Sequence, residues 1–351
     1  GLFQGLMPLV GYTIARTFAD KIGAVDHWVA FGLLAFIGGK MLWEVFRGKD
    51  DDLPSGDPCG WKNLLVMSVA TSIDALAVGV TFAFLEVEIL PAPEGGSSAL
   101  VAAGGADFGI DAQDTLAPAF VGEDALPVTA VAALIQHNTS GIISLASDNI
   151  QSPKDLEGKT YATWENPVEQ AVIKSLMEAD GGDFSKLNLV PSTVSDVITA
   201  LNTNIDTVWI FYAWDGVATE LKGYDTNFMD FAKLNTTFDY YTPIIIANND
   251  FLAENPDTAK AFLAATAKGY EYAIENPDAA ADILLEAAPE LDPEIVKASQ
   301  EWLADQYIAD AEKWGYIDPA RWDGFYTWLT ENNLVDGELP AGIGYSNDYL
   351  A

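Results

Sequence analysis

Hydrophobic residues are distributed very differently in the two parts of this 351-residue chain. Residues 1–85 contain three long apolar runs, at 1–18, 28–46 and 64–85, and the last run has 22 residues with a single charge. A helix of about 20 apolar residues is long enough to cross a membrane. The pattern therefore predicts three transmembrane α-helices in residues 1–85.

Beyond residue 85 short apolar segments alternate with longer amphipathic ones, which predicts an α/β fold with parallel sheets covered by helices on both faces. Six expected helices begin with a capping side chain followed by proline, which suits the first helical position. These capping residues are Ser152, Asn166, Asn255, Asn276, Asp292 and Asp318. The expected strands are 87–90, 106–110, 128–134, 159–163, 187–190, 207–212 and 242–247. No strand is expected in the helical region 257–333.

The second part carries almost all of the negative charge. The whole chain has 17 Lys and Arg against 52 Asp and Glu, for a net charge of −35, yet residues 1–86 contain only 6 basic and 9 acidic residues. Such an acidic surface repels nucleic acid, so we expect no nucleic-acid partner. Cys59 is the sole cysteine, which excludes a disulfide framework and a thiolate metal cluster, and we expect no cofactor.

Asp74 interrupts the third apolar run. A carboxylate near the middle of a membrane costs roughly 2.5 to 3.5 kcal/mol, so we expect it to face the inside of a helix bundle. Met67, Thr71 and Thr81 lie on the same helical stripe. The stripe is consistent with a cation site and equally with a protonated or hydrogen-bonded carboxyl group inside a bundle.

Aromatic and acidic residues follow the predicted strands where ligands bind in open α/β sheets. Trp164 and Glu165 follow one strand, and Trp214 and Asp215 follow another. Rings of this kind stack on a flat heterocycle, while carboxylates accept its amino hydrogens. The alternative is that Trp209 is core and that the two acidic residues are solvated helix caps. Polar residues after earlier strands complete the candidate set, namely Ser97 and Gln113.

Three motifs in the first 85 residues resemble the small six-helix manganese efflux pumps. They are GLFQGLMPLVGY, DHWVAFGLLAFIGGKM and ATSIDALAVGV, which match the second, third and fourth helices of that family. The resemblance implies that Asp74 is the acidic residue that the family uses for the metal. The first helix, with its companion acidic residue, and the last two helices have no counterpart in the chain.

Residues 86–351 resemble solute-binding proteins of ABC importers for the thiamine pyrimidine precursor, hydroxymethylpyrimidine. The resemblance rests on DFGIDAQDTL, KTYATWENPVEQAV, DTVWIFYAWDGV, YYTPIIIANNDFLAENP and WGYIDPARWDGFYTWL. It implies a type II periplasmic-binding-protein fold, with lobe 1 at about 86–143 and 240–351 and lobe 2 at about 144–239. The family's first strand and helix are missing, and with them one wall of the site.

The resemblance also implies a ligand site. We expect Trp164, Trp214, Tyr212 and Tyr241 to surround an aminopyrimidine, with Glu165 and Asp215 accepting its amino hydrogens. The crossovers between the lobes are expected near residues 139–143 and 241–246.

The two resemblances together predict a binding protein held at the cell membrane. Basic residues are in slight excess in the loop before the third apolar run, which places the solute-binding domain on the extracytoplasmic side. The expected partners are a small heterocyclic solute, ABC permease and ATPase subunits, and the lipid bilayer. We expect binding without catalysis, because residues 86–351 lack cysteine and show no catalytic triad, zinc or phosphate-loop pattern. The alternatives are manganese ion efflux by the membrane part, and a non-native fusion with neither activity intact.

Overall fold

The computed structural model describes residues 87–91, 93, 96–122 and 125–350. The chain divides into two units, Gly1–Pro91 and Ala92–Ala351. The three predicted transmembrane helices and Asp74 therefore lie outside the described residues. Within the part that the structure describes, no helix is both long and apolar enough to cross a membrane.

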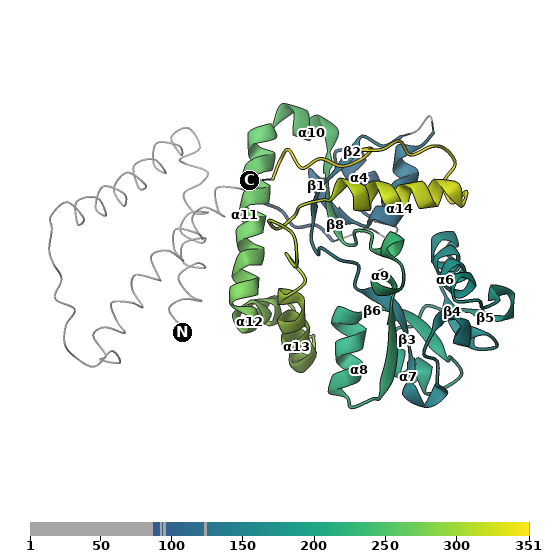
Figure 1. Ribbon diagram of the computed structural model, residues 1–351. Helices are drawn as coiled ribbons and strands as arrows, with labels where there is room; N and C mark the ends of the chain where they lie inside the picture. Colours follow the sequence, from purple (N-terminus) through teal and green to yellow (C-terminus); the bar gives the residue numbers. More distant parts are fainter. Residues whose placement is uncertain (1–86, 92, 94–95, 123–124, 351) are drawn as a thin grey trace, which may run out of the picture. The chain divides into compact units, whose positions relative to one another are not determined.

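One sheet of the second unit has three strands in the order β1-β8-β2, and β8 runs antiparallel to both neighbours (Figure 1). Its strands are β1 (Phe108–Asp111), β2 (Val128–Ala133) and β8 (Ile244–Asn248). One face packs on α14 through Trp322 and Phe325, and the other packs on α11 through Leu263. This sheet and its helices form lobe 1. Its helices include α4 (Ser98–Ala102), α10 (Asn249–Glu254), α11 (Pro256–Glu275) and α14 (Pro319–Glu331).

The other sheet has five strands in the order β5-β4-β6-β3-β7. Its strands are β3 (Ser140–Leu145), β4 (Thr160–Thr163), β5 (Asn188–Pro191), β6 (Thr207–Phe211) and β7 (Thr226–Asp230). β4 runs parallel to β5 and β6, whereas β3 runs antiparallel to β6 and β7. Tyr161 and Trp209 face α6, and Ala162 and Val208 face α7 on the opposite side. This sheet and its helices form lobe 2.

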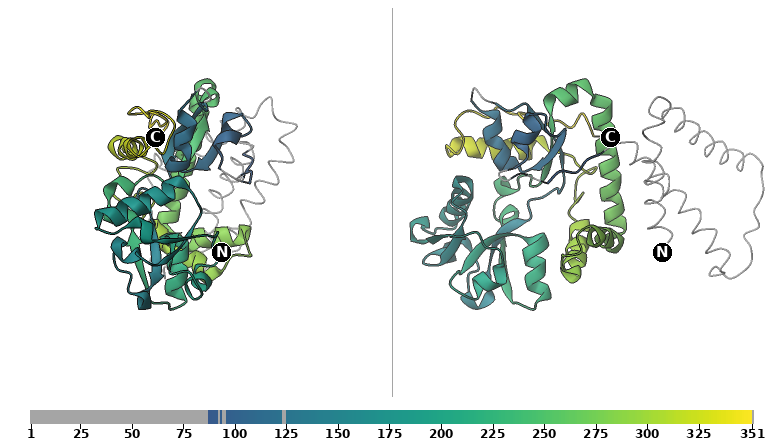
Figure 2. Two further views of the ribbon diagram at one scale, coloured as in Figure 1. Left: turned by 90° about the vertical axis from the view of Figure 1, so that its right-hand side faces the viewer. Right: turned by 180° about the vertical axis from the view of Figure 1, so that it is seen from behind.

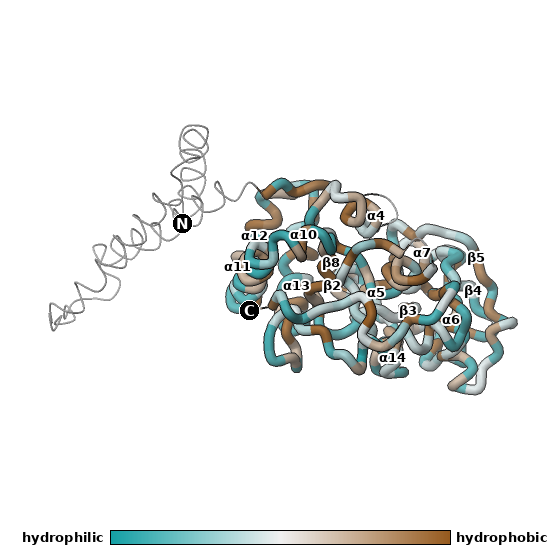
Figure 3. The backbone as a smooth tube through the Cα atoms, turned by 90° about the horizontal axis from the view of Figure 1, so that it is seen from above, coloured by the Kyte–Doolittle hydropathy of each residue, from teal (hydrophilic) through white to brown (hydrophobic). Residues whose placement is uncertain are grey.

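Helices begin where the proline signals predicted them. Asn166, Asp292 and Asp318 each cap the helix that follows by accepting a backbone N–H. Asn255 and Asn276 precede their helices without a side-chain cap bond. Other helices are α5 (Gln113–Leu116), α6 (Pro167–Ala179), α7 (Val197–Leu201), α8 (Val217–Leu221), α9 (Phe231–Leu234), α12 (Pro277–Ala287) and α13 (Pro293–Ala304). Hydrophilic residues are frequent along α6 and α11, whereas β8 is hydrophobic (Figure 3).

The sheets differ from the prediction in three respects. The five-stranded sheet is mixed and the three-stranded sheet is antiparallel, because the strands that leave each crossover run against their neighbours. β3 and β7 were not predicted. The predicted strand at 87–90 does not form, and Val87, Ile89 and Leu90 are exposed. Residues 87–90 pair with none of the described strands, and an isolated extended segment is not stable as a strand.

Two segments connect the lobes, at residues 134–139 between β2 and β3 and at residues 231–243 between β7 and β8 (Figure 2). The expected crossover at 139–143 therefore falls largely within β3. His137 ties these segments together, since Nδ1 lies 2.8 Å from Asp239 Oδ2 and Nε2 lies 2.9 Å from Asp310 Oδ1. Arg321 Nε lies 3.4 Å from the same Asp239 oxygen. The hydrogen bond to Asp239 is the main reason that the pKa of His137 is raised.

We predict that the substitution His137→Gln destabilises the protein more at pH 6 than at pH 9. A raised folded-state pKa contributes stability below the unfolded value near 6.5, and this contribution is lost as pH rises through the folded-state pKa. Urea unfolding of both proteins at the two pH values measures the difference. An equal loss of unfolding free energy at both pH values would show that the His137 ring stabilises the protein without its charge.

Candidate functional site

The carboxyl ends of β4 and β6 place two aromatic–acidic pairs at one edge of the lobe 2 sheet. The strands are parallel neighbours with Ala162 opposite Val208, so both run toward the same end of the sheet. We call the four residues at this position, Trp164, Glu165, Trp214 and Asp215, the lobe 2 edge. The sequence predicted that these four residues belong to one site, and both strands that carry them end at this edge.

The turn after β4 leaves Trp164 and Glu165 exposed to solvent. Trp164 is 44% exposed, which is unusual for so large an apolar ring. Glu165 is also exposed and has a φ of 62°, a left-handed conformation that is uncommon outside glycine. Its N–H donates to Thr163 Oγ1 at 2.9 Å. A strained backbone that is held in place by hydrogen bonds is a frequent feature of binding sites.

Beneath this turn lies the buried carboxylate of Glu169, which is 3% exposed. It accepts hydrogen bonds from Thr163 Oγ1 at 3.0 Å, from Trp164 N at 3.1 Å and from Asn166 N at 3.3 Å. The Tyr161 hydroxyl donates to its other oxygen. Burial, and then the charge of Glu169, raise the pKa of Tyr161 far above its usual range, which keeps this hydroxyl a donor. The network fixes the position of the Trp164 backbone.

A single π-helical turn, Tyr212–Gly216, follows β6 and carries the second pair. Trp214 is 40% exposed, and Asp215 is half-buried. Burial, followed by the charge of Asp196, raises the pKa of the Asp215 carboxyl. Short π-helical turns occur often at functional sites because they redirect side chains.

Tyr212 points from the same turn into a different environment. Its ring lies 4.9 Å from that of Phe228 and 5.3 Å from that of Trp302 on α13, and its hydroxyl donates to Glu220. Burial raises the pKa of Tyr212 to about 12. Tyr212 therefore connects lobe 2 to the C-terminal helices, and its hydroxyl is already engaged.

The candidate residues from lobe 1 are all buried. Gln113 donates from Nε2 to the Trp322 carbonyl at 2.9 Å and accepts from Tyr241 N at 2.9 Å. Tyr241 is 1% exposed, and its hydroxyl accepts the N–H of Asp318 at 2.8 Å. Ser97 is 6% exposed and begins α4 with its N–H on Asp111 Oδ2. These three residues support lobe 1, and the structure does not place their side chains at the lobe 2 edge.

Trp209 lies behind the lobe 2 edge. It is 5% exposed, and its ring lies 5.7 Å from that of Trp164 and 4.3 Å from that of Phe231. This burial agrees with the interpretation of Trp209 as a core residue. Its indole N–H has no hydrogen-bond partner among the described residues.

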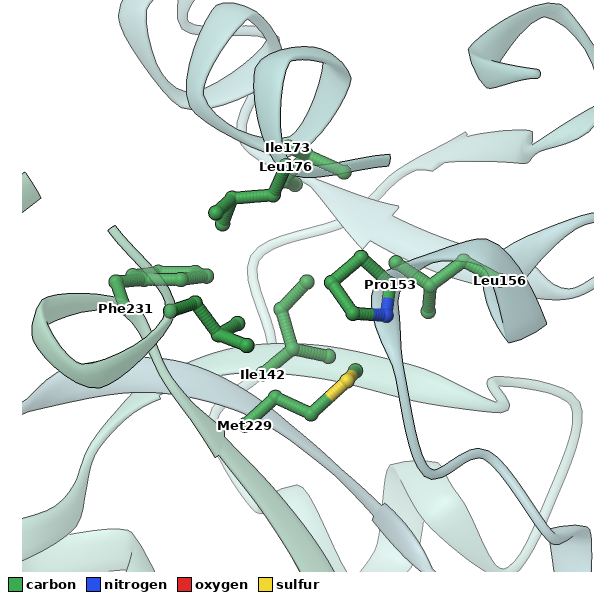
Figure 4. A pocket seen from close by; sticks show the side chains of 8 residues that line it. Ile142, Pro153, Leu156, Ile173, Leu176, Met229 and Phe231 are labelled. Atoms are coloured by element: carbon green, nitrogen blue, oxygen red, sulfur yellow. The ribbon is translucent and has the colours of Figure 1, made fainter. Parts of the chain in front are cut away.

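An apolar gap elsewhere in lobe 2 is unsuited to a polar ligand. Side chains from β3, β7, α6 and α9 surround it, including Ile142, Met229, Ile173 and Phe231 (Figure 4). A heterocycle needs a few polar groups to orient it, and these side chains offer none. Within the described ranges, no group of three or more His, Cys, Asp and Glu residues could hold a metal ion.

Sequence reasoning missed the role of Glu169, although its signal was present. Asn166 and Glu169 have the spacing of a capping box, and both of its hydrogen bonds form. The additional bonds to Thr163 and Trp164 depend on the neighbouring strand and could not be predicted from helix-start spacing.

We predict that Glu169→Gln lowers the free energy of unfolding by about 1.5–3 kcal/mol, because hydrogen bonds to a buried charged acceptor are lost and an amide N–H₂ faces donors. The matched control is Glu178→Gln on the same helix, where the side chain is 57% exposed and should contribute under about 0.5 kcal/mol. Urea unfolding measures both changes. Equal effects of the two substitutions would contradict the proposed network.

Two of the solved structures that resemble this chain are of sulphonate-binding proteins. The periplasmic aliphatic sulphonate binding protein SsuA from Escherichia coli has 17% identity, a TM-score of 0.59, and coverage of 78% of this chain and 85% of that one. The alkanesulfonate-binding protein SsuA from Xanthomonas axonopodis pv. citri, bound to MOPS, has 11% identity, a TM-score of 0.54, and coverage of 72% and 83%. At these identities the likeness establishes a periplasmic-binding-protein-like α/β fold.

Two family models match different parts of the chain. The model described as a putative manganese efflux pump matches residues 1–118. A putative manganese efflux pump of Bacteroides fragilis is 52% identical over 88 residues, which cover 25% of this chain and 45% of that protein. The chain thus spans about half the length of the curated relatives it matches. The model described as NMT1/THI5 like matches residues 83–280, more than half of the chain. The protein therefore belongs to the NMT1/THI5-like family.

Proposed function

We propose that the chain is the extracytoplasmic solute-binding component of an ABC importer for a thiamine pyrimidine precursor or a similar heterocycle. The observation that carries the proposal is the lobe 2 edge. It presents two exposed indoles, Trp164 and Trp214, each followed by a carboxylate, at the ends of adjacent parallel strands. Indole faces stack on planar rings, and carboxylates accept hydrogen bonds from ring amino groups.

Charge favours this class of ligand over an anion. The sulphonates after which the two SsuA proteins are named are anionic. The site of this chain contains Glu165 and Asp215 in a protein of net charge −35, so an anionic group would be repelled. A neutral or cationic nitrogen heterocycle is attracted by the same groups. Binding without chemical conversion is proposed, with an ABC permease and ATPase as partners.

Membrane attachment is the second element of the proposal. The match of residues 1–118 to the efflux-pump model supports a membrane-embedded first part. With the predicted orientation, that part tethers the binding domain outside the cell membrane. The lobe 2 edge then meets solutes before they reach the permease.

We predict that Trp164→Ala and Trp214→Ala each weaken the binding of hydroxymethylpyrimidine about ten- to a hundredfold, since a stacking ring contributes roughly 1–3 kcal/mol. Isothermal titration calorimetry with the full chain measures the affinity. Tyr272→Ala is the control, because Tyr272 on α11 is 46% exposed and belongs to no candidate site. If the wild type binds hydroxymethylpyrimidine and neither tryptophan substitution changes the affinity, the binding site lies elsewhere.

Manganese efflux by the first part is the second candidate function, because the pump model matches residues 1–118. The 88 aligned residues cover only 45% of the pump from Bacteroides fragilis. We therefore expect that expression of the chain does not rescue a manganese-sensitive strain that lacks its exporter. Growth in manganese that is restored by the wild type and lost with Asp74→Asn would favour efflux over the binding function.

A further inference from the structure

Asp114 occupies the position in lobe 1 that corresponds to the lobe 2 edge. It follows β1 in the first turn of α5, at the carboxyl end of that strand. Ligands of open α/β sheets bind at this end of the strands. The neighbouring residues Gln113 and Leu116 are fully buried and pack into the lobe, whereas Asp114 is only half-buried.

The other polar groups of this turn are already engaged. Asp111 accepts hydrogen bonds from the N–H groups of Ser97 and Ser98 and from Thr115 Oγ1, the last at 2.6 Å. Gln113 is held by the backbone of Trp322 and Tyr241. In the part of the chain that the structure describes, no side chain donates a hydrogen bond to Asp114.

The surroundings of Asp114 place it beside the junction of the two lobes. Its charge acts on Tyr240, which follows Asp239 in the second crossover, and on Tyr326 of α14. Both rings are buried, and Tyr240 stacks on Phe325 at 4.1 Å. A carboxylate among buried aromatic rings loses much of its hydration.

Desolvation has a measurable consequence. Burial raises the pKa of Asp114 to about 6, and the nearby Asp111 carboxylate contributes in the same direction. The backbone N–H groups of Asp114 and Thr115 offset this only in part. At neutral pH the group is therefore ionised at a cost to stability, because its folded-state pKa lies above the unfolded value.

We propose that Asp114 is the lobe 1 anchor for the ligand, accepting a hydrogen bond from a nitrogen that carries hydrogen, of the amidine type found in an aminopyrimidine ring. This inference rests on the proposed function and adds a second point of attachment to the lobe 2 edge. A ligand held by Asp114 on one lobe and by the indoles of the other connects the two lobes. The N–H donor also replaces the hydration that the carboxylate has lost.

The test compares the wild type with Asp114→Asn in the full chain, with hydroxymethylpyrimidine as the probe and calorimetry at pH 8 and pH 5. We expect the variant to bind at least tenfold more weakly at pH 8, where the carboxylate is ionised. At pH 5 the wild-type carboxyl is mostly protonated, so the ratio of the two affinities should approach one. The ratio cancels any titration of the probe itself.

Stability provides a readout that needs no ligand. Asp114→Asn should stabilise the protein at pH 8 relative to the wild type and have little effect at pH 4, because the desolvated charge is absent at low pH. Asp250→Asn is the matched control, since Asp250 also lies in the first turn of a short helix of lobe 1 but is exposed. It should change neither the affinity nor the stability.

The outcomes separate the two proposals. A wild type that binds the probe with an affinity unchanged by Asp114→Asn at pH 8 would overturn this inference and leave the proposed function standing. An equal loss of affinity at both pH values, together with lower stability, would assign Asp114 a structural role and also overturn it. A wild type that binds no probe at either pH would overturn the proposed function and this inference with it.

Discussion

The geometry of the candidate site depends on one buried charge, the carboxylate of Glu169. A charged group in the interior is tolerated only when its hydrogen bonds are satisfied, and those of Glu169 come from Tyr161, Thr163, Trp164 and Asn166. The carboxylate and the turn that surrounds it therefore require each other. As a result, Trp164 remains at the end of β4 instead of collapsing into the apolar layer that contains Trp209.

Both lobes bring a desolvated carboxylate to the carboxyl ends of their strands, Asp114 in lobe 1 and Asp215 in lobe 2. Burial is the first cause of the raised pKa in each case, and a second carboxylate adds to it. No lysine or arginine side chain of the described residues forms a salt bridge with either. The pattern differs from that of the ion pairs at the protein surface, where Lys186 lies 2.9 Å from Glu157. Hydrogen-bond donors of a bound ligand would stabilise these two carboxylates more than the surrounding water does.

Local signals in the sequence were sufficient for helix starts and for the residues after β4 and β6, because capping and strand ends depend on near neighbours. They were insufficient for β3 and β7, whose antiparallel pairing joins residues such as Ile142 and Met229 that are far apart in the chain. Gln113 and Tyr241 were placed in the site for their chemistry. Their burial arises from contacts with α14, at residues 318–322, which no local pattern encodes. The positions of residues at the site were thus more predictable than the directions of their side chains.

The three-stranded sheet makes lobe 1 dependent on the C-terminal part of the chain. β8 is buried along its whole length, yet β1 leaves Ile110 58% exposed at an edge with no neighbouring strand among the described residues. The apolar face of a sheet must be buried against another element. Trp322 and Phe325 of α14 supply that packing, and Tyr345 contacts Trp322. The same helix carries Arg321, whose pairing with Asp239 fixes the second crossover. The region that completes the core of lobe 1 therefore also holds the connection through which lobe 2 is positioned.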